Sequence, residues 1–318
     1  MNGKRRGKGY MVPKKKKMKK WNIREAVNAY LFIAPFLIGI SIFYIYAFIQ
    51  NIYISLTNKK SFGVPRFIGL ANYEKLFQDA EFYESVLHTV LYVLICVPLV
   101  ILLAIVIAVA LNCKIKGKGL YRTLIYLPII TLPTAIGMLW KWLFNAQFGV
   151  INAILNGLGI KGNPEWLSDP DLSLSAMCIV LVWASVGQAV IIFLAGLQGI
   201  PGSYYEAARI DGAGGVQCFF RITLPLLSPI TFLMVTTEVI GFFQVFDLIF
   251  LMITPTSSGM SGARSIVMLY YEEAFKNFNK GYGAAISFIL FLIILVITII
   301  QMKVGGQAVL GRQGREST

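Results

Sequence analysis

The chain has little charge, one histidine and no paired cysteines. Of its 318 residues, 14% are charged and 57% are hydrophobic. A typical soluble domain has about 25% charged residues, so this chain lacks the polar surface of a soluble protein. A net charge of +14 alone would suggest a nucleic-acid-binding protein, but the scarcity of charge excludes that class.

Groups that support catalysis or metal binding are also scarce. His88 is the only histidine, so a His-rich metal site is excluded. The four cysteines have no spacing typical of a disulfide framework or a metal site, and they lie at positions 96, 113, 178 and 218. No Gly-x-x-x-x-Gly-Lys-[Ser/Thr] sequence is present, so the chain cannot hold nucleotide phosphates in that type of loop.

Long apolar runs dominate the rest of the sequence. A helix needs about 20 mostly apolar residues to cross a bilayer. Six segments meet this requirement, and we predict membrane-spanning helices at residues 30–50, 86–111, 123–144, 174–196, 229–253 and 284–302. Several contain Pro or Gly, which membrane helices tolerate better than soluble ones do. The sequence therefore predicts an all-α polytopic membrane protein.

The positive charges predict the orientation of these spans. Eleven of the 29 Lys and Arg residues precede position 25. If the N-terminus is cytoplasmic, the inner segments hold 20 of the 29, and the short loop at 112–122 alone holds four. Cytoplasmic loops carry an excess of Lys and Arg, so we predict both termini inside. The basic segment 1–29 is interpreted as a topology anchor on anionic lipid rather than as a signal peptide.

The inner loop between the fourth and fifth spans has the most specific pattern. Ser203 and Glu206 have the spacing of a capping box that starts a helix. Gly212 would end this helix in the left-handed conformation. A second short helix at 216–222 would run until Leu224 and Pro225. The expected structure is a compact helix–turn–helix.

This loop resembles the EAA loop of permeases from ATP-binding-cassette (ABC) importers, and the match extends to their carbohydrate branch. The matching residues of the loop are Glu206, Ala207, Ala208, Asp211, Gly212, Ala213, Ile222, Leu224 and Pro225. Further similarity to that branch lies at residues 67–73, 121–128, 140–145, 149–152, 246–247 and 282–285. Two departures stand out, because residues 254–262 lack the branch's Gly-rich turn and the tail at 305–318 differs from that of the partner-type permease. The tail suggests the first permease subunit of a maltose-type or multiple-sugar importer.

The resemblance implies a type I ABC importer permease fold, in which the EAA helix couples to an ATPase. The implied partners are a second homologous permease, two ATPase subunits, an extracytoplasmic solute-binding protein and membrane lipid, with no nucleic acid. ATP and Mg would be used by the ATPase, so this chain would be non-catalytic and would bind no cofactor or metal. The expected location is the bacterial cell membrane, with residues 1–29 as a basic segment, 30–302 as the permease domain and 303–318 as the tail.

The candidate substrate residues are polar and aromatic groups inside the fourth and fifth spans. Ionisable groups within a membrane are costly and usually face the interior of a bundle. Glu238 can therefore face a cavity, or it can be neutral and bonded to a neighbouring helix, and Trp183 can equally be packing. The predicted set is Trp183, Ser185, Gln188, Glu238, Phe242, Gln244 and Asp247.

The resemblance to ABC importer permeases therefore implies ATP-driven import of a carbohydrate by alternating access. A first alternative is a permease of the same superfamily for glycerol phosphate, a polyamine or an amino acid. An ion-coupled secondary transporter would show inverted repeats and broken helices around a midplane site, and it leaves the EAA pattern unexplained. A membrane-embedded enzyme would need more catalytic groups than Glu238, Asp247 and His88 provide.

Overall fold

The computed structural model describes residues 23–60, 63–113, 116–160 and 162–313. Within these ranges the regular structure is helical, apart from one isolated antiparallel bridge between Thr57 and Phe67. The chain divides into two compact units, residues 1–50 and 51–318. Residues 1–22 of the predicted basic segment 1–29 lie outside the described residues.

The described part of the first unit is one long apolar helix. It consists of α1 (Ile23–Ile40), the π-helical segment η1 (Ser41–Tyr46) and the beginning of α2 (Ala47–Ser55). None of the residues whose burial is described between 27 and 50 is buried, and Phe32 is 89% exposed. The predicted span at 30–50 lies within this helix. Its exposed apolar side chains require contact with lipid or with another protein.

The second unit is built around two long helices, α4 (Ala80–Asn112) and α8 (Pro170–Gln198). Both begin several residues before the predicted spans at 86–111 and 174–196, because an aspartate caps each N-terminus. The side chain of Asp79 accepts a hydrogen bond from the backbone N–H of Glu81 at 3.0 Å, and Asp169 accepts one from Asp171 at 2.9 Å. Such caps satisfy backbone donors that have no partner within the helix.

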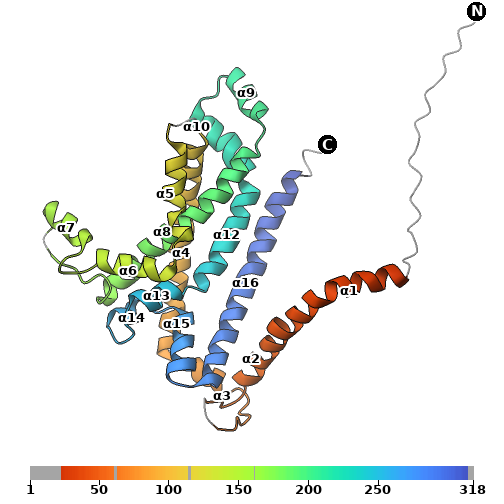
Figure 1. Cartoon of the computed structure of the whole chain (residues 1–318), viewed down its shortest axis with the longest axis vertical. Coiled ribbons are helices and arrows are strands. Elements are labelled where there is room, and N and C mark those ends of the chain that lie inside the picture. Colours follow the sequence, from red (N-terminus) through yellow and green to blue (C-terminus); the bar gives the residue numbers. More distant parts are fainter. Residues whose placement is uncertain (1–22, 61–62, 114–115, 161, 314–318) are drawn as a thin grey trace, which may run out of the picture. The chain divides into compact units, whose positions relative to one another are not determined.

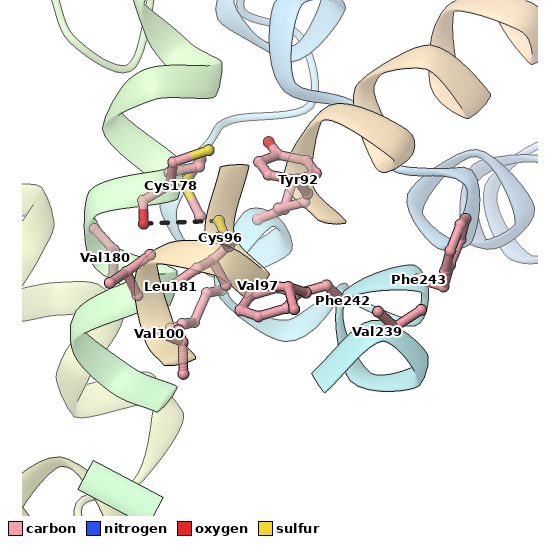
Figure 2. Packing of buried hydrophobic residues seen from close by; sticks show 14 of the residues in the cluster. Tyr92, Cys96, Val97, Val100, Cys178, Val180, Leu181, Val239, Phe242 and Phe243 are labelled. Carbon is pink, nitrogen blue, oxygen red and sulfur yellow. Dashed lines mark hydrogen bonds between the residues drawn. The ribbon is translucent and has the colours of Figure 1, made fainter. Parts of the chain in front are cut away.

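Small side chains let α4 and α8 pack closely. A stripe at four-residue spacing on α4 is fully buried and comprises Tyr92, Cys96, Val100, Ala104 and Ala108. Residues four apart lie on one helix face, and small residues there allow membrane helices to approach each other. Figure 2 shows this face of α4 against Cys178 and Leu181 of α8, with Phe242 of α12 (Ser228–Phe243) completing the cluster.

The segment predicted as one span at 123–144 consists of two helices. These are α5 (Lys118–Ile130) and α6 (Pro133–Leu143), and their axes are bent by 103°. The break falls at Thr131 and Leu132, both of which have extended backbone. A residue before proline is pushed out of the helical region, and Pro133 follows directly. The expectation of a continuous helix here is therefore wrong.

The segment predicted as one span at 229–253 is also interrupted. Its main helix, α12, ends at Phe243, and a separate helix, α13, covers Asp247–Met252. Before α12 lies a helical run that bends by 65° into it. This run comprises α10 (Gly215–Cys218), the π-helical η2 (Phe219–Thr223) and α11 (Leu224–Leu226).

The remaining elements are short helices and one long terminal helix. They are α3 (Ala71–Leu76), α7 (Val150–Gly157), α9 (Gly202–Ile210), α14 (Gly259–Ala263), α15 (Ile266–Tyr271), π-helical η3 (Glu272–Lys276) and α16 (Lys280–Gln313). The predicted span at 284–302 lies within α16. Of the described helices, four are long and apolar enough to cross a membrane, or up to six if each bent pair forms one span. Figure 1 places α9 at one end of the second unit and α3, α14 and α15 at the other.

Candidate functional site

Helix α9 carries the Glu206-Ala207-Ala208 sequence, but it does not begin as predicted. Its N-cap residue is Pro201, and no side chain forms a capping hydrogen bond there. Ser203 lies inside the first turn, so the predicted capping box is wrong. The fixed φ of proline sets the entry into this helix in place of a serine cap.

The end of α9 confirms the prediction for Gly212. This glycine has φ +78°, which is the left-handed conformation that glycine adopts without steric cost. The backbone N–H of Ala213 donates to the carbonyl of Ala208 at 2.8 Å, and that of Gly212 donates to Arg209 at 3.1 Å. This pair of bonds is a Schellman motif, which satisfies the last carbonyls of the helix.

The second arm of the loop is longer than predicted. Helical structure runs from Gly215 to Leu226, whereas we expected it to stop before Leu224 and Pro225. Pro225 lies in α11, directly after the π-helical segment η2. The Tyr205 and Thr223 hydroxyls lie 3.0 Å apart and link the two arms, so the compact helix–turn–helix is confirmed.

The loop displays apolar groups that nothing in the described part of the chain covers. No residue of α9 is buried, and Ile210 is 87% exposed. Exposed large apolar side chains also occur at Tyr204, Val216 and Phe220. Of the motif residues, Glu206, Ala207, Asp211 and Gly212 are exposed, whereas Ala208, Ala213, Ile222, Leu224 and Pro225 are half-buried. A grouped apolar surface of this kind is typical of a protein–protein contact.

A cavity of about 260 Å³ lies between α8 and α12. Its lining includes four of the seven predicted substrate residues, and the full set is Leu181, Ser185, Gln188, Thr237, Glu238, Gly241, Phe242 and Val245. On α8 the lining residues are three or four positions apart, and on α12 the pair Thr237–Glu238 lies one turn before the pair Gly241–Phe242, so the members on each helix share a face. Phe242 is buried and belongs both to this lining and to the hydrophobic cluster drawn in Figure 2.

A second cavity of about 420 Å³ adjoins the first. The two share Leu181, Gln188, Gly241 and Val245, and the second also contains Gln244 and Asp247. It reaches the break between α5 and α6 through Thr131 and Pro133. We refer to the two spaces together as the α8–α12 cavity. Six of the seven predicted residues line it.

Trp183 is the one predicted residue that the α8–α12 cavity does not include. Its ring packs edge to face on that of Trp140, with centroids 5.6 Å apart. Trp140 also lies 5.4 Å from the ring of Phe144. Trp183 therefore belongs to an aromatic cluster between α6 and α8.

Polar groups of the cavity are free to bind a ligand. Among the described residues, the structure gives no hydrogen-bond or ion-pair partner for the side chains of Gln188, Glu238, Gln244 and Asp247. No described Lys or Arg lines either part of the cavity. Amides and carboxylates placed beside an aromatic and aliphatic wall suit a neutral ligand rich in hydroxyl groups. In the described part of the chain, no cluster of three His, Cys, Asp or Glu residues could hold a metal ion.

The sequence analysis did not identify Thr131, Thr237 and Pro133 as cavity residues. Thr237 precedes Glu238, but its side chain also bonds to the carbonyl of Leu233 at 2.9 Å, as membrane threonines commonly do. For Thr131, the available sequence signal of a helix break was the Leu132-Pro133 pair that follows it. The hydroxyl of Thr131 donates to the carbonyl of Leu127 at 2.7 Å.

An ion-pair network lies at the opposite end from α9. Arg264 contacts Glu81 at 2.7 Å and Glu272 at 3.2 Å, and Glu272 also contacts Lys276 at 3.7 Å. Burial raises the pKa of Glu272, while the positive charge of Arg264 opposes this shift. From sequence, Glu272 and Glu273 were expected to be solvated or to contact a binding protein. Glu272 is not solvated, because its side chain is only 14% exposed, and a contact with a binding protein stays a prediction for both residues.

Comparison with known proteins identifies the family. The model described as binding-protein-dependent transport system inner membrane component matches residues 80–304. The trehalose/maltose transport system permease protein MalF of Thermococcus litoralis is 35% identical over 289 residues, covering 90% of this chain and 96% of that protein. The arabinooligosaccharides transport system permease protein AraP of Halalkalibacterium halodurans is 34% identical, covering 89% of each chain.

Two further similarities extend this result. The sn-glycerol-3-phosphate transport system permease protein UgpA of Agrobacterium fabrum is 35% identical, covering 86% of this chain and 93% of that protein. A chain from the crystal structure of a bacterial ABC transporter that imports alginate has the same fold, with a TM-score of 0.79, 21% identity and coverage of 90% and 97%. The chain therefore belongs to the family of binding-protein-dependent transport system inner membrane components and is an integral membrane transport protein.

Proposed function

We propose that this chain is a permease subunit of an ATP-driven ABC importer and that it translocates a carbohydrate by alternating access. The α8–α12 cavity carries the proposal, because six of seven residues chosen for sugar binding line it. Sugars present hydroxyl groups and apolar ring faces. The sugar hydroxyl groups can form hydrogen bonds with Gln188, Glu238 and Gln244. The apolar ring faces can contact Phe242 and the aliphatic wall of the cavity.

The charges of the cavity favour a neutral sugar over glycerol phosphate. The relative UgpA bears the name of a glycerol-phosphate system, so that solute is the main alternative. A phosphate ester would lie beside Glu238 and Asp247 with no described Lys or Arg lining the cavity. Like charges in a low-dielectric site repel strongly, which disfavours an anionic solute.

The α9 loop is the proposed contact with the ATPase. In this arrangement the bent pairs each count as one span, giving six spans within a permease domain at 30–302, with both termini and the α9 loop cytoplasmic. The residues assigned to coupling are Glu206, Ala207, Ala208, Asp211, Gly212, Ala213, Ile222, Leu224 and Pro225. Exposed Ile210 and Tyr204 supply apolar surface that an ATPase cleft would cover. Differential docking of this loop in two ATPase states would shift the permease between its two conformations.

The remaining components of the importer would be other polypeptides. A second homologous permease, two ATPases that use ATP and Mg, and an extracytoplasmic binding protein would complete it, and this chain would be the first permease subunit. One solved structure with the same fold is an alginate ABC transporter in complex with a periplasmic protein bound to an alginate pentasaccharide. That assembly supports a binding-protein partner here.

Uptake by the reconstituted complex tests the proposal. The complex, with its cognate permease, ATPases and binding protein, would be placed in proteoliposomes, and ATP-dependent uptake of a panel of sugars and of glycerol phosphate would be measured. Gln188→Ala and Glu238→Ala are expected to raise the sugar concentration needed for half-maximal uptake. Ser175→Ala is the matched control, because Ser175 lies on α8 outside the cavity and its hydroxyl donates to the carbonyl of Leu172 at 2.7 Å. Unchanged apparent affinity in both cavity variants would contradict the site, and transport of glycerol phosphate alone would contradict the solute class.

A further inference from the structure

A separate cavity lies at the end of the second unit that is opposite to α9. It has a volume of about 170 Å³ and lies where the segment after α2, helix α3 and the start of α16 meet. Its lining contains three lysines, three asparagines, a glycine and a tyrosine, namely Lys59, Lys60, Lys75, Asn58, Asn72, Asn279, Gly281 and Tyr282. We call it the lysine cavity. It shares no residue with the α8–α12 cavity.

The walls of the lysine cavity are held by backbone hydrogen bonds. The Asn72 side-chain amide, which is 9% exposed, donates to the carbonyls of Ser55 at 2.7 Å and Thr57 at 2.9 Å. The backbone N–H of Gly281 donates to the carbonyl of Lys59 at 2.9 Å. A Cβ on Gly281 would collide with the carbonyl of Thr57, so only glycine permits this approach. The cavity is therefore a built feature of the fold.

The positive charge of the cavity is not neutralised within the described part of the chain. None of the three lysines has a carboxylate within 4.0 Å there. Lys75 instead lies over the ring of Tyr282, with its Nζ 4.2 Å from the ring centroid.

The neighbouring acids already have partners. The hydroxyl of Tyr282 donates to Asp79. Glu273 accepts hydrogen bonds from the side chains of Asn277 at 2.8 Å and Asn279 at 3.0 Å. These donors are neutral, so both acids keep their negative charge, but neither acid lines the cavity, whose own charged residues are the three lysines.

The location of the cavity indicates the source of an anionic ligand. It lies at the ends of three apolar helices, since α2 ends at Ser55, α4 begins at Ala80 and α16 begins at Lys280. Loops outside the cell are normally poor in lysine, so a lysine group there needs a reason. Exposed aromatic side chains accompany it at Tyr53, Phe77 and Tyr83. Tyrosines of this kind lie at the level of lipid headgroups.

We propose that the lysine cavity binds the phosphate group of an anionic phospholipid in the outer leaflet. Lysine is a compact point charge that binds phosphate well, and three lysines with a rigid wall form a site for a single headgroup. The proposal depends on the proposed orientation of the chain in the membrane, but not on the solute that it transports. The bound lipid would fix the α2–α3 segment against the start of α16.

Lipid retention by the purified importer complex tests this site. The complex would be transferred to nanodiscs of equal parts phosphatidylcholine and phosphatidylglycerol, extracted with mild detergent, and analysed by native mass spectrometry for bound phosphatidylglycerol. The triple variant Lys59→Gln, Lys60→Gln, Lys75→Gln is expected to lose this lipid. Each basic residue near an anionic surface contributes roughly fivefold, so the affinity should fall on the order of 100-fold.

Two controls keep the proposal falsifiable. The triple Lys→Arg variant at the same positions is expected to retain the lipid, which separates loss of charge from loss of folding. Lys141→Gln, which removes a lysine outside the cavity, is expected to have no effect. Retention of phosphatidylglycerol by the triple Gln variant would overturn the proposal.

A further arm identifies the source of the phosphate group. Inorganic phosphate is expected to displace the retained lipid only at high concentration. If inorganic phosphate binds in detergent while the lipid is never retained, the lipid assignment is wrong. If the triple Gln variant instead loses affinity for the binding protein with unchanged lipid retention, the cavity recognises acidic protein groups. Because none of these readouts involves transport, failure here is distinguishable from failure of the proposed function.

Discussion

Buried side chains tie α4 to residues 263–266 at one end of the 51–318 unit, whereas at the other end α9 contains no buried residue. The Tyr92 hydroxyl donates to the carbonyl of Ala263 at 2.9 Å, and the Thr89 hydroxyl accepts from the backbone N–H of Ile266 at 2.9 Å. In the α9 loop, a contact between the hydroxyls of Tyr205 and Thr223 links the two helical arms. The first end is held by contacts within the unit, whereas the second leaves apolar side chains such as Ile210 exposed.

This difference has a physical consequence for coupling. Packed interiors have few discrete arrangements and transmit a displacement instead of absorbing it. A partner that moves α9 would therefore transmit the movement through η2 and α12 to the α8–α12 cavity. The following predictions test whether the two ends differ in this way.

The largest expected effect is on the stability of the packed end, by which we mean the end of the 51–318 unit where α4 contacts residues 263–266. Tyr92→Ala removes a fully buried ring from the α4 stripe, and such a substitution costs about 3–5 kcal/mol. The thermal unfolding midpoint of the detergent-purified complex should fall strongly. Tyr204→Ala in α9 is the matched control, because Tyr204 is exposed and its loss should change stability by less than about 0.5 kcal/mol. Equal losses in the two variants would contradict the comparison.

The second prediction concerns the turn of the α9 loop. A non-glycine residue in the left-handed conformation costs about 1–2 kcal/mol, so Gly212→Leu should distort the turn while the core remains folded. ATP hydrolysis should then continue with strongly reduced sugar uptake, measured side by side in proteoliposomes. Gly202→Ala is the control, since a Cβ there meets nothing within 4 Å and φ is not positive. Normal transport by Gly212→Leu would show that this turn has no role in coupling.

The third prediction separates docking from folding. Ile210→Ser replaces an 87% exposed apolar side chain, so the unfolding midpoint should stay nearly constant, within about 0.5 kcal/mol of stability. The affinity for the ATPase should fall, because the partner would otherwise cover this side chain. Affinity would be measured by titrating fluorescently labelled ATPase onto the permease pair in nanodiscs. Tighter or unchanged binding would exclude Ile210 from the docking surface.

The sequence predicts the local structure of the α9 loop better than it predicts the long-range contacts of the packed end. The end of α9 is predictable because a glycine after a short helix is a local signal, and the i, i+3, i+4 spacing on α12 places Glu238, Gly241 and Phe242 on one face. The pairing of Arg264 with Glu81 joins residues 183 apart, and no local pattern reports it. Trp183 is excluded from the cavity by Trp140, which lies on another helix.

The broken spans show a second limit of sequence reasoning. Pro128 lies inside α5 without ending it, whereas Pro133 follows the break before α6. Both are prolines in apolar surroundings, and membrane helices tolerate either arrangement. Only the second proline follows a break, and α13 packs on the helix that begins there, a contact between distant parts of the sequence that no local pattern reports. The six-span count and the roles of the cavity residues stay predictions for the same reason.

The smallest expected effect is a pH dependence at the packed end. Burial raises the pKa of Glu272 above its usual 4.5. The folded state therefore binds the proton more tightly than the unfolded state does. The resulting stability is fully present below pH 4.5 and is lost as the pH rises through the folded-state pKa. Glu272→Gln removes this titration.

The unfolding midpoints of wild type and Glu272→Gln would be compared from pH 4 upward. The wild type should lose stability relative to the variant as the pH rises through that window, and the difference should then become constant. At the higher pH values the ion pair with Arg264 partly offsets the cost of burying the charged Glu272 carboxylate. The loss of stability should therefore be modest. A wild type that gains stability relative to the variant with rising pH would show that Arg264 outweighs burial. The packed end would then be held by its ion pairs more than by its apolar contacts.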